Sequence, residues 1–194
     1  MLGSIIVQTG DGLLGSVNRR LASYGVPPGL MNGLEFASAV ACGVCLAQRM
    51  VPAALLLLLI HGLFDYLDGG LRRAAVHTGR RFAPAPLRHT VIDKLSDVFL
   101  YLSLAWGGWT GWWLAATASV MTVAVSVVGW WGQRRRVKQR EDCLFDRSDR
   151  ILVLLVLFPC SLFVPAVITT FLMNLAVLAE RVRSLFRAAG QFEL

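Results

Sequence analysis

Long apolar runs alternate with short charged stretches along most of this chain. A helix needs about 20 mainly apolar residues to cross a membrane, and several runs approach that length. Their order predicts an all-α membrane protein with six transmembrane helices, the last two joined tightly around Pro159 and Pro165. The six predicted spans cover residues 30–48, 51–70, 90–109, 112–131, 150–164 and 165–180.

The N-terminal segment has a different pattern. Residues 11–24 mix leucine and valine with arginine and asparagine, which is typical of a short amphipathic helix lying on the membrane surface. The Val-Pro-Pro-Gly stretch at 26–29 is expected to end that helix. We therefore predict two parts, an amphipathic segment over residues 1–29 and a six-helix membrane domain over residues 30–194.

Composition and charge favour the same class of protein. Hydrophobic residues make up 56% of the chain and charged residues 16%, whereas ordinary soluble domains contain about 25% charged residues. The mean hydropathy is +0.60. The formal charge is +7, but the basic residues flank the apolar runs instead of forming one soluble domain, which argues against a nucleic-acid partner.

The positions of the basic residues predict an orientation. Nearly all of them lie in the N-terminal segment and in residues 71–92, 132–150 and 181–194, whereas the opposite connections hold only Arg49. Cytoplasmic loops of membrane proteins carry such an excess of lysine and arginine. We therefore expect an integral protein of the cell membrane with these segments in the cytoplasm.

Two pairs of aspartates lie on the second and third predicted spans, at their cytoplasmic ends. Asp65 and Asp68 are three residues apart, and Asp93 and Asp97 are four apart, so each pair shares one face of its helix. Carboxylates near apolar spans are costly and usually mark a functional site. Four hard oxygen ligands brought together suit Mg²⁺ or Mn²⁺, so the sequence predicts a membrane-embedded, metal-dependent enzyme.

These residues resemble the signature of the CDP-alcohol phosphotransferase family, Asp-x2-Asp-Gly-x2-Ala-Arg followed by Gly-x3-Asp-x3-Asp. The four aspartates, Gly69 and Arg73 match this signature in identity and local spacing. The six-span layout with an amphipathic N-terminal helix is also similar to this family, so the resemblance extends over most of the chain.

The resemblance implies a reaction and a metal centre. A phosphatidyl-type group would move from a CDP-lipid, commonly CDP-diacylglycerol, to the hydroxyl of a polyol, and CMP would leave. The family uses two divalent cations, Mg²⁺ or Mn²⁺, and often forms homodimers. By the match, Asp65, Asp68, Asp93 and Asp97 would hold the metals, and Asp97 would also be the general base.

The resemblance also implies contacts to both substrates. Residues that would contact the CDP group are Asp65, Gly69, Arg73 and Asn32. Arg147 and Arg150 resemble an Arg-x-x-Arg stretch found in members that accept inositol phosphate, and arginine suits a bidentate hold on a phosphate. We therefore expect a phosphorylated acceptor, either inositol phosphate or glycerol phosphate.

This chain departs from the family signature at two positions, and the stretch between the two halves of the signature is longer than usual. Arg72 stands where the family has alanine, and His89 stands where it has the second glycine. The stretch between Arg73 and His89, 15 residues long, exceeds the usual length and adds basic residues and prolines. Small residues in such signatures let a ligand approach the backbone closely, so the departures bear on the fit of the nucleotide.

Two other functions remain open from the sequence. A catalytically divergent relative would keep the fold and serve in binding or assembly. A cation transporter would use the aspartates as its transport site, and it predicts acids nearer the middle of the membrane with no special glycine or arginine. Nucleotide-dependent turnover separates the enzyme from both alternatives.

Overall fold

Helices account for nearly all of the described structure. The computed structural model describes residues 14–77, 86–134 and 147–190, and this part contains no strand. A short N-terminal helix covers residues 14–24. Six further helices follow: α2 (Pro28–Ala47), α3 (Val51–His77), α4 (Pro86–Trp106), α5 (Trp112–Arg134), the shorter α6 (Arg147–Leu157) and α7 (Phe163–Gly190). The all-α class predicted from the sequence is therefore confirmed.

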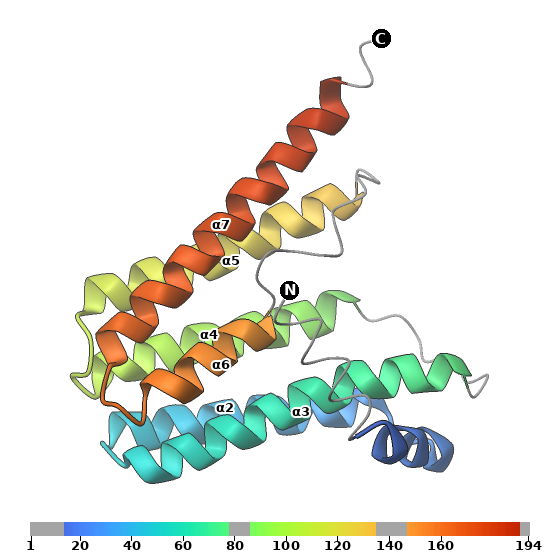
Figure 1. The fold of residues 1–194 in the computed structure, drawn as a ribbon, viewed down its shortest axis with the longest axis horizontal. Helices are drawn as coiled ribbons and strands as arrows, with labels where there is room; N and C mark the ends of the chain where they lie inside the picture. The colour runs from blue at the N-terminus through green and yellow to red at the C-terminus, as the bar shows by residue number, and fades with distance from the viewer. Residues whose placement is uncertain (1–13, 78–85, 135–146, 191–194) are drawn as a thin grey trace.

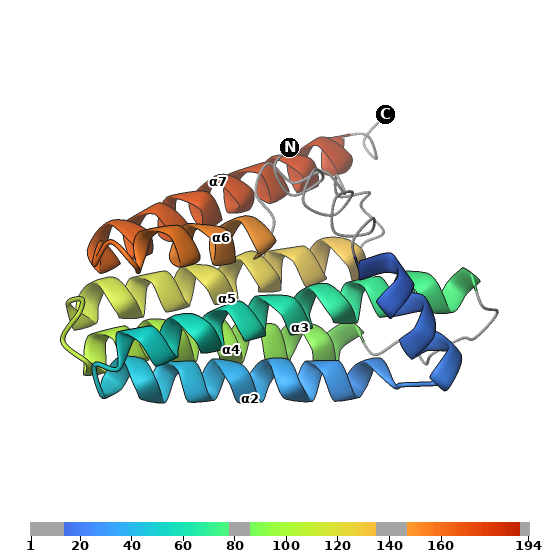
Figure 2. The ribbon, with the colours of Figure 1, turned by 60° about the horizontal axis from the view of Figure 1, so that its bottom comes forward.

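The long helices form one bundle that opens at one end. Figure 1 shows α2 and α3 side by side next to α4 and α6, while α5 and α7 form a pair that diverges from α3. Buried side chains from all six helices make the main core, which includes Leu46, Leu58, Leu104 and Val167. The N-terminal helix crosses the end of α3 (Figure 2), where Ala22 packs in a second apolar cluster with α2 and α3 residues.

The ends of four helices differ from the sequence prediction. α3 continues to His77 instead of ending near residue 70, and α4 begins at Pro86 instead of near residue 90. Proline suits this first position because its φ is preset and its missing N–H would be unbonded there. The predicted boundary between the last two spans is wrong, because α6 ends at Leu157 and α7 already begins at Phe163.

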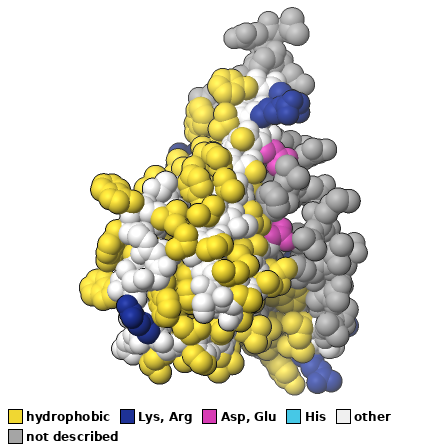
Figure 3. All heavy atoms as spheres, turned by 60° about the vertical axis from the view of Figure 1, so that its left-hand side comes forward, with side chains coloured by type: hydrophobic (Ala, Val, Ile, Leu, Met, Phe, Trp, Pro, Cys, Tyr) yellow, Lys and Arg dark blue, Asp and Glu magenta, His cyan; other side chains and the backbone are white. Residues whose placement is uncertain are grey.

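Four of the described helices are long and apolar enough to cross a membrane, namely α2, α3, α5 and α7. α4 carries the charged residues Asp93, Lys94 and Asp97, and α6 has 11 residues. An 11-residue helix is about 16 Å long, about half of the ~30 Å hydrocarbon core. Hydrophobic side chains cover most of the face in Figure 3, with Lys and Arg at its edges. These features support an integral membrane protein.

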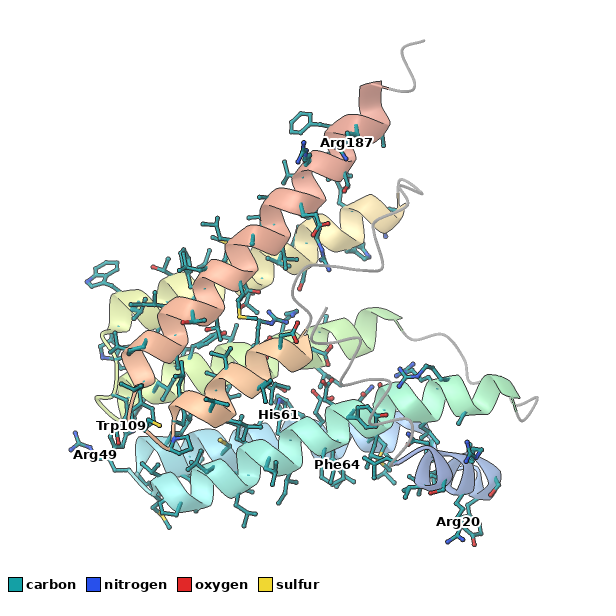
Figure 4. All side chains as sticks on the ribbon, viewed as in Figure 1. Arg20, Arg49, His61, Phe64, Trp109 and Arg187 are labelled. Carbon is teal, nitrogen blue, oxygen red and sulfur yellow. The ribbon has the colours of Figure 1, made fainter. Side chains whose placement is uncertain are left out.

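Contacts between two turns close the end of the bundle that lies opposite the aspartates. The Arg49 Nε donates a hydrogen bond to the Gly107 carbonyl at 3.0 Å, and the Trp109 indole donates to the Leu46 carbonyl at 2.8 Å. Figure 4 shows Arg49 and Trp109 together at this end, far from Arg187 near the C-terminus. The turn between α2 and α3 is thereby tied to the turn between α4 and α5, which leaves the other end to open.

Helices α2 and α4 approach closely at Gly43. A Cβ atom added to Gly43 would overlap the ring of Phe99 and the hydroxyl of Ser103, both on α4. Small residues at helix contacts in membranes allow such close backbone approach. Because α2 carries Glu35 and α4 carries Asp93, this contact sets the separation of two carboxylates discussed below.

Replacing Gly43 with alanine is expected to lower the unfolding temperature, because overpacking a tight contact costs about 1–3 kcal/mol. The measurement is thermal unfolding of the purified protein in detergent. Gly33→Ala is the matched control, since Gly33 lies on the same helix and a Cβ there would meet nothing within 4 Å. Equal unfolding temperatures for the two variants would contradict the close contact between α2 and α4.

Candidate functional site

Three carboxylates from three different helices meet inside the bundle. One ligand oxygen from each of Glu35 on α2, Asp65 on α3 and Asp93 on α4 lies within 4.8 Å of the other two. The Glu35 side chain is fully buried and Asp93 is 8% exposed. Like charges packed this closely away from water repel one another, so the arrangement favours a bound cation.

The donor set and its spacing fit a divalent metal. Carboxylate oxygens are the ligands that Mg²⁺ and Mn²⁺ prefer. Two oxygens on opposite sides of one Mg²⁺ ion lie about 4.2 Å apart, which is twice the usual Mg–O distance. The 4.8 Å spread of the Glu35, Asp65 and Asp93 oxygens therefore needs only a small inward movement to form one coordination sphere.

The other acid on α3 has an arginine partner. Asp68 is fully buried, and its Oδ2 accepts a hydrogen bond from the Arg72 Nε at 2.9 Å. Arg72 is the residue that stands in place of the alanine in the family signature, so the departure has a local consequence. Asp68 is not a member of the three-residue cluster, and an ion would have to compete with Arg72 for its Oδ2.

Asp97 lies deeper in the bundle than Asp93. It is nine residues before the end of α4 at Trp106, which is about 14 Å along the helix axis. Its Oδ2 lies 3.5 Å from the Lys94 Nζ and 3.9 Å from the Arg150 Nη1 of α6. The Asp97 side chain is 12% exposed. Two positively charged side chains therefore face the Asp97 carboxylate, one from its own helix and one from a helix distant in sequence.

The residues predicted to contact the nucleotide lie on α2 and α3, the helices that carry Glu35 and Asp65. Asn32 is buried one turn before Glu35 on α2, so the two residues share a helix face. A Cβ added to Gly69 would lie 3.4 Å from the Arg73 Nη1, so these two predicted residues are neighbours. Arg73 itself is exposed.

The predicted acceptor contacts lie at the start of α6. Arg150 is among the described side chains and contacts Asp97 as stated above. Arg147 is the first residue of α6, but its side chain lies outside the described residues, as does that of His89.

Sequence reasoning missed two polar residues that the structure brings to this region. Glu35 was not among the predicted site residues, although an acid in an apolar span is itself a signal of function. His61 on α3 is fully buried, and its Nδ1 lies 3.1 Å from the Glu35 carbonyl, so that ring nitrogen must donate the hydrogen bond. Figure 4 shows His61 in the middle of the bundle, between α3 and α6.

The fold is similar to that of phosphatidylinositol phosphate synthase (PgsA1) from Mycobacterium tuberculosis. Its apo form matches with a TM-score of 0.68 and 16% identity, over 88% of this chain and 95% of that chain. The form with CDP-DAG bound gives 0.65 and 18%, over 88% and 90% of the two chains. The complex with manganese and citrate gives 0.69 and 16%, over 88% of each chain.

At 16–18% identity these matches show that the chain has the fold of PgsA1, over most of its length. No protein-family model matches the sequence, and no curated protein is significantly similar to it.

Proposed function

We propose that this protein is a metal-dependent CDP-alcohol phosphotransferase that moves a phosphatidyl-type group from a CDP-lipid to a polyol and releases CMP. The convergence of Glu35, Asp65 and Asp93 carries the proposal, because these three carboxylates could hold a divalent metal and two of them are matched signature residues. Structural neighbours bound to CDP-DAG and to manganese support it.

The proposed roles of the acids follow from their positions. Asp65, Asp93 and Glu35 would hold one divalent cation, with Asp68 and Asp97 as ligands of a second. Bound Mg²⁺ or Mn²⁺ would neutralise charge on the diphosphate and on the departing CMP. Asp97, deeper in the bundle, would accept the proton of the attacking hydroxyl as general base.

The remaining roles concern substrate binding. Arg73 would pair with a phosphate oxygen of the CDP group, beside Gly69, which leaves room for the ligand. Asn32, on the Glu35 face of α2, would contact the nucleotide. Arg147 and Arg150 at the start of α6 would bind the phosphate of the acceptor, which favours inositol phosphate or glycerol phosphate over a neutral alcohol.

We further propose six membrane-spanning segments, with the aspartates facing the cytoplasm and the helix over residues 14–24 on the membrane surface. The mainly polar start of α4 and the short α6 would then lie where protein instead of lipid surrounds them. The charge distribution in the sequence supports this orientation, and the family resemblance supports a homodimer.

The test is CMP release by the purified protein in detergent with CDP-diacylglycerol and a panel of acceptors. The panel contains inositol phosphate, glycerol phosphate, inositol and serine. We expect release with one phosphorylated acceptor, its loss on chelation of divalent cations, and its return when Mg²⁺ or Mn²⁺ is added. Metal-independent release, or no release with any acceptor or other CDP-alcohol donor from a folded protein, would contradict the proposal.

One observation favours cation transport as a second candidate. Asp97 lies about 14 Å from the far end of α4, close to the middle of a bilayer core of about 30 Å. A transporter reconstituted in vesicles would carry Mn²⁺ across the membrane without CDP-alcohol, whereas the enzyme would not.

A further inference from the structure

A chain of buried polar side chains leads from Asp97 to the far side of the bundle. The Arg150 Nη1 on α6 donates a hydrogen bond to the Asn174 Oδ1 on α7 at 2.5 Å. The Asn174 Nδ2 in turn donates to the Thr122 Oγ1 on α5 at 3.1 Å. The chain therefore joins α4, α6, α7 and α5 at one level.

The last two side chains of this hydrogen-bonded series are well buried. Asn174 is 1% exposed and Thr122 is fully buried. Removing one partner from such a buried contact leaves the other unsatisfied, which is why these contacts are held in one geometry. Both oxygen and nitrogen of the Asn174 amide are used, so its orientation is fixed from two sides.

The geometry of Arg150 relative to Asp97 is unusual for an arginine–carboxylate pair. The same Nη1 that bonds Asn174 lies 3.9 Å from the Asp97 Oδ2, too far for a hydrogen bond. An arginine released beside a carboxylate would normally close to a bidentate pair at about 2.7–2.9 Å. The contact to Asn174 therefore holds the guanidinium back from Asp97.

A small cavity lies at the same place. It has a volume of about 10 Å³, and its lining includes His61, Asp97, Tyr101 and Arg150. That volume is close to the minimum that admits one water molecule. This cavity therefore lies directly beside both Asp97 and Arg150.

We propose that Asn174 is a positioning residue that acts through Arg150, holding its guanidinium close enough to orient Asp97 but too far to occupy its oxygen. Asp97 then stays accessible to the hydroxyl of the acceptor. This inference rests on the proposed function, because it assigns Asn174 a part in that reaction. Asn174 itself touches neither the reacting atoms nor the carboxylate cluster.

The experiment is a double-mutant cycle with Asn174→Leu and Arg150→Met. Asn174→Leu alone is expected to lower kcat about tenfold or more, as for a lost hydrogen bond to a charged group, with KM for CDP-diacylglycerol unchanged. In the Arg150→Met background the same change should have little further effect, since residues that act through one contact are not additive. Equal losses of kcat in both backgrounds would overturn the proposal.

A control variant separates the loss of kcat from a general loss of stability, and a second measurement applies even if the protein shows no turnover. Val177→Ala shortens a buried apolar side chain of α7 and removes no polar group, so it should lower the unfolding temperature and keep kcat. If the wild-type protein releases no CMP, the proposed function fails, and unfolding temperatures of the same four cycle members test the contact. Additive shifts would then overturn the restraint of Arg150 by Asn174, and non-additive shifts would support that restraint.

Discussion

Replacing Asp97 with asparagine is expected to reduce CMP release at least about 100-fold, the usual loss when a positioned general base is removed. Asparagine keeps the shape of the side chain but cannot take up a proton at neutral pH. Lys94 and Arg150 would lose the charge that they face. The measurement is initial rate against acceptor concentration at saturating CDP-diacylglycerol and metal.

A neighbouring residue provides the control for this variant. Ser96 is fully buried next to Asp97, and its hydroxyl bonds the Ile92 carbonyl of its own helix at 3.0 Å. Ser96→Ala therefore changes a buried polar group of α4 without touching the proposed site, and it should keep most of the turnover. An Asp97→Asn protein that retains wild-type rates would remove Asp97 from the mechanism, while leaving the metal cluster to be tested separately.

The sequence predicted the parts of this site that lie on regular helix faces. Asp65 and Asp93 each share a helix face with the second aspartate of their pair, and they come close together because α3 and α4 both pack against α2. The helix bounds were least accurate where polar residues continue a helix beyond its apolar run. α3 extends to His77 because helical hydrogen bonds do not require an apolar environment.

The local sequence pattern could not predict that Glu35 belongs to the carboxylate cluster. Its proximity to Asp65 and Asp93 depends on the packing of α2 against both α3 and α4, including the close approach at Gly43. The contact between Arg150 and Asn174 likewise joins residues 24 positions apart. Polar residues in apolar spans signal that partners exist, but only the packing of helices identifies them.

Because Glu35 lies in the carboxylate cluster, replacing it should raise the unfolding temperature of the metal-free protein and reduce the stabilisation that a bound metal provides. Glu35→Gln removes one of three closely packed carboxylates, of which Glu35 and Asp93 are buried and Asp65 is half-buried, so the metal-free variant should unfold at a higher temperature than the metal-free wild type. Added Mn²⁺ should stabilise the variant less, because a lost ligand weakens binding and the stabilisation by a ligand follows its affinity. We expect Mn²⁺ affinity to fall about tenfold or more.

Titration calorimetry and thermal unfolding of the detergent-purified protein, both without substrate, measure these two effects. Glu180→Gln makes the same charge change on α7, outside the cluster, so it separates local coordination from net charge. Asp65→Asn should weaken Mn²⁺ binding as Glu35→Gln does. If Glu35→Gln matched Glu180→Gln in affinity and unfolding temperature, Glu35 would be a hydrogen-bonded structural acid. Removing a ligand changes the affinity for its ion, so an unchanged affinity would mean that only the aspartates bind the metal.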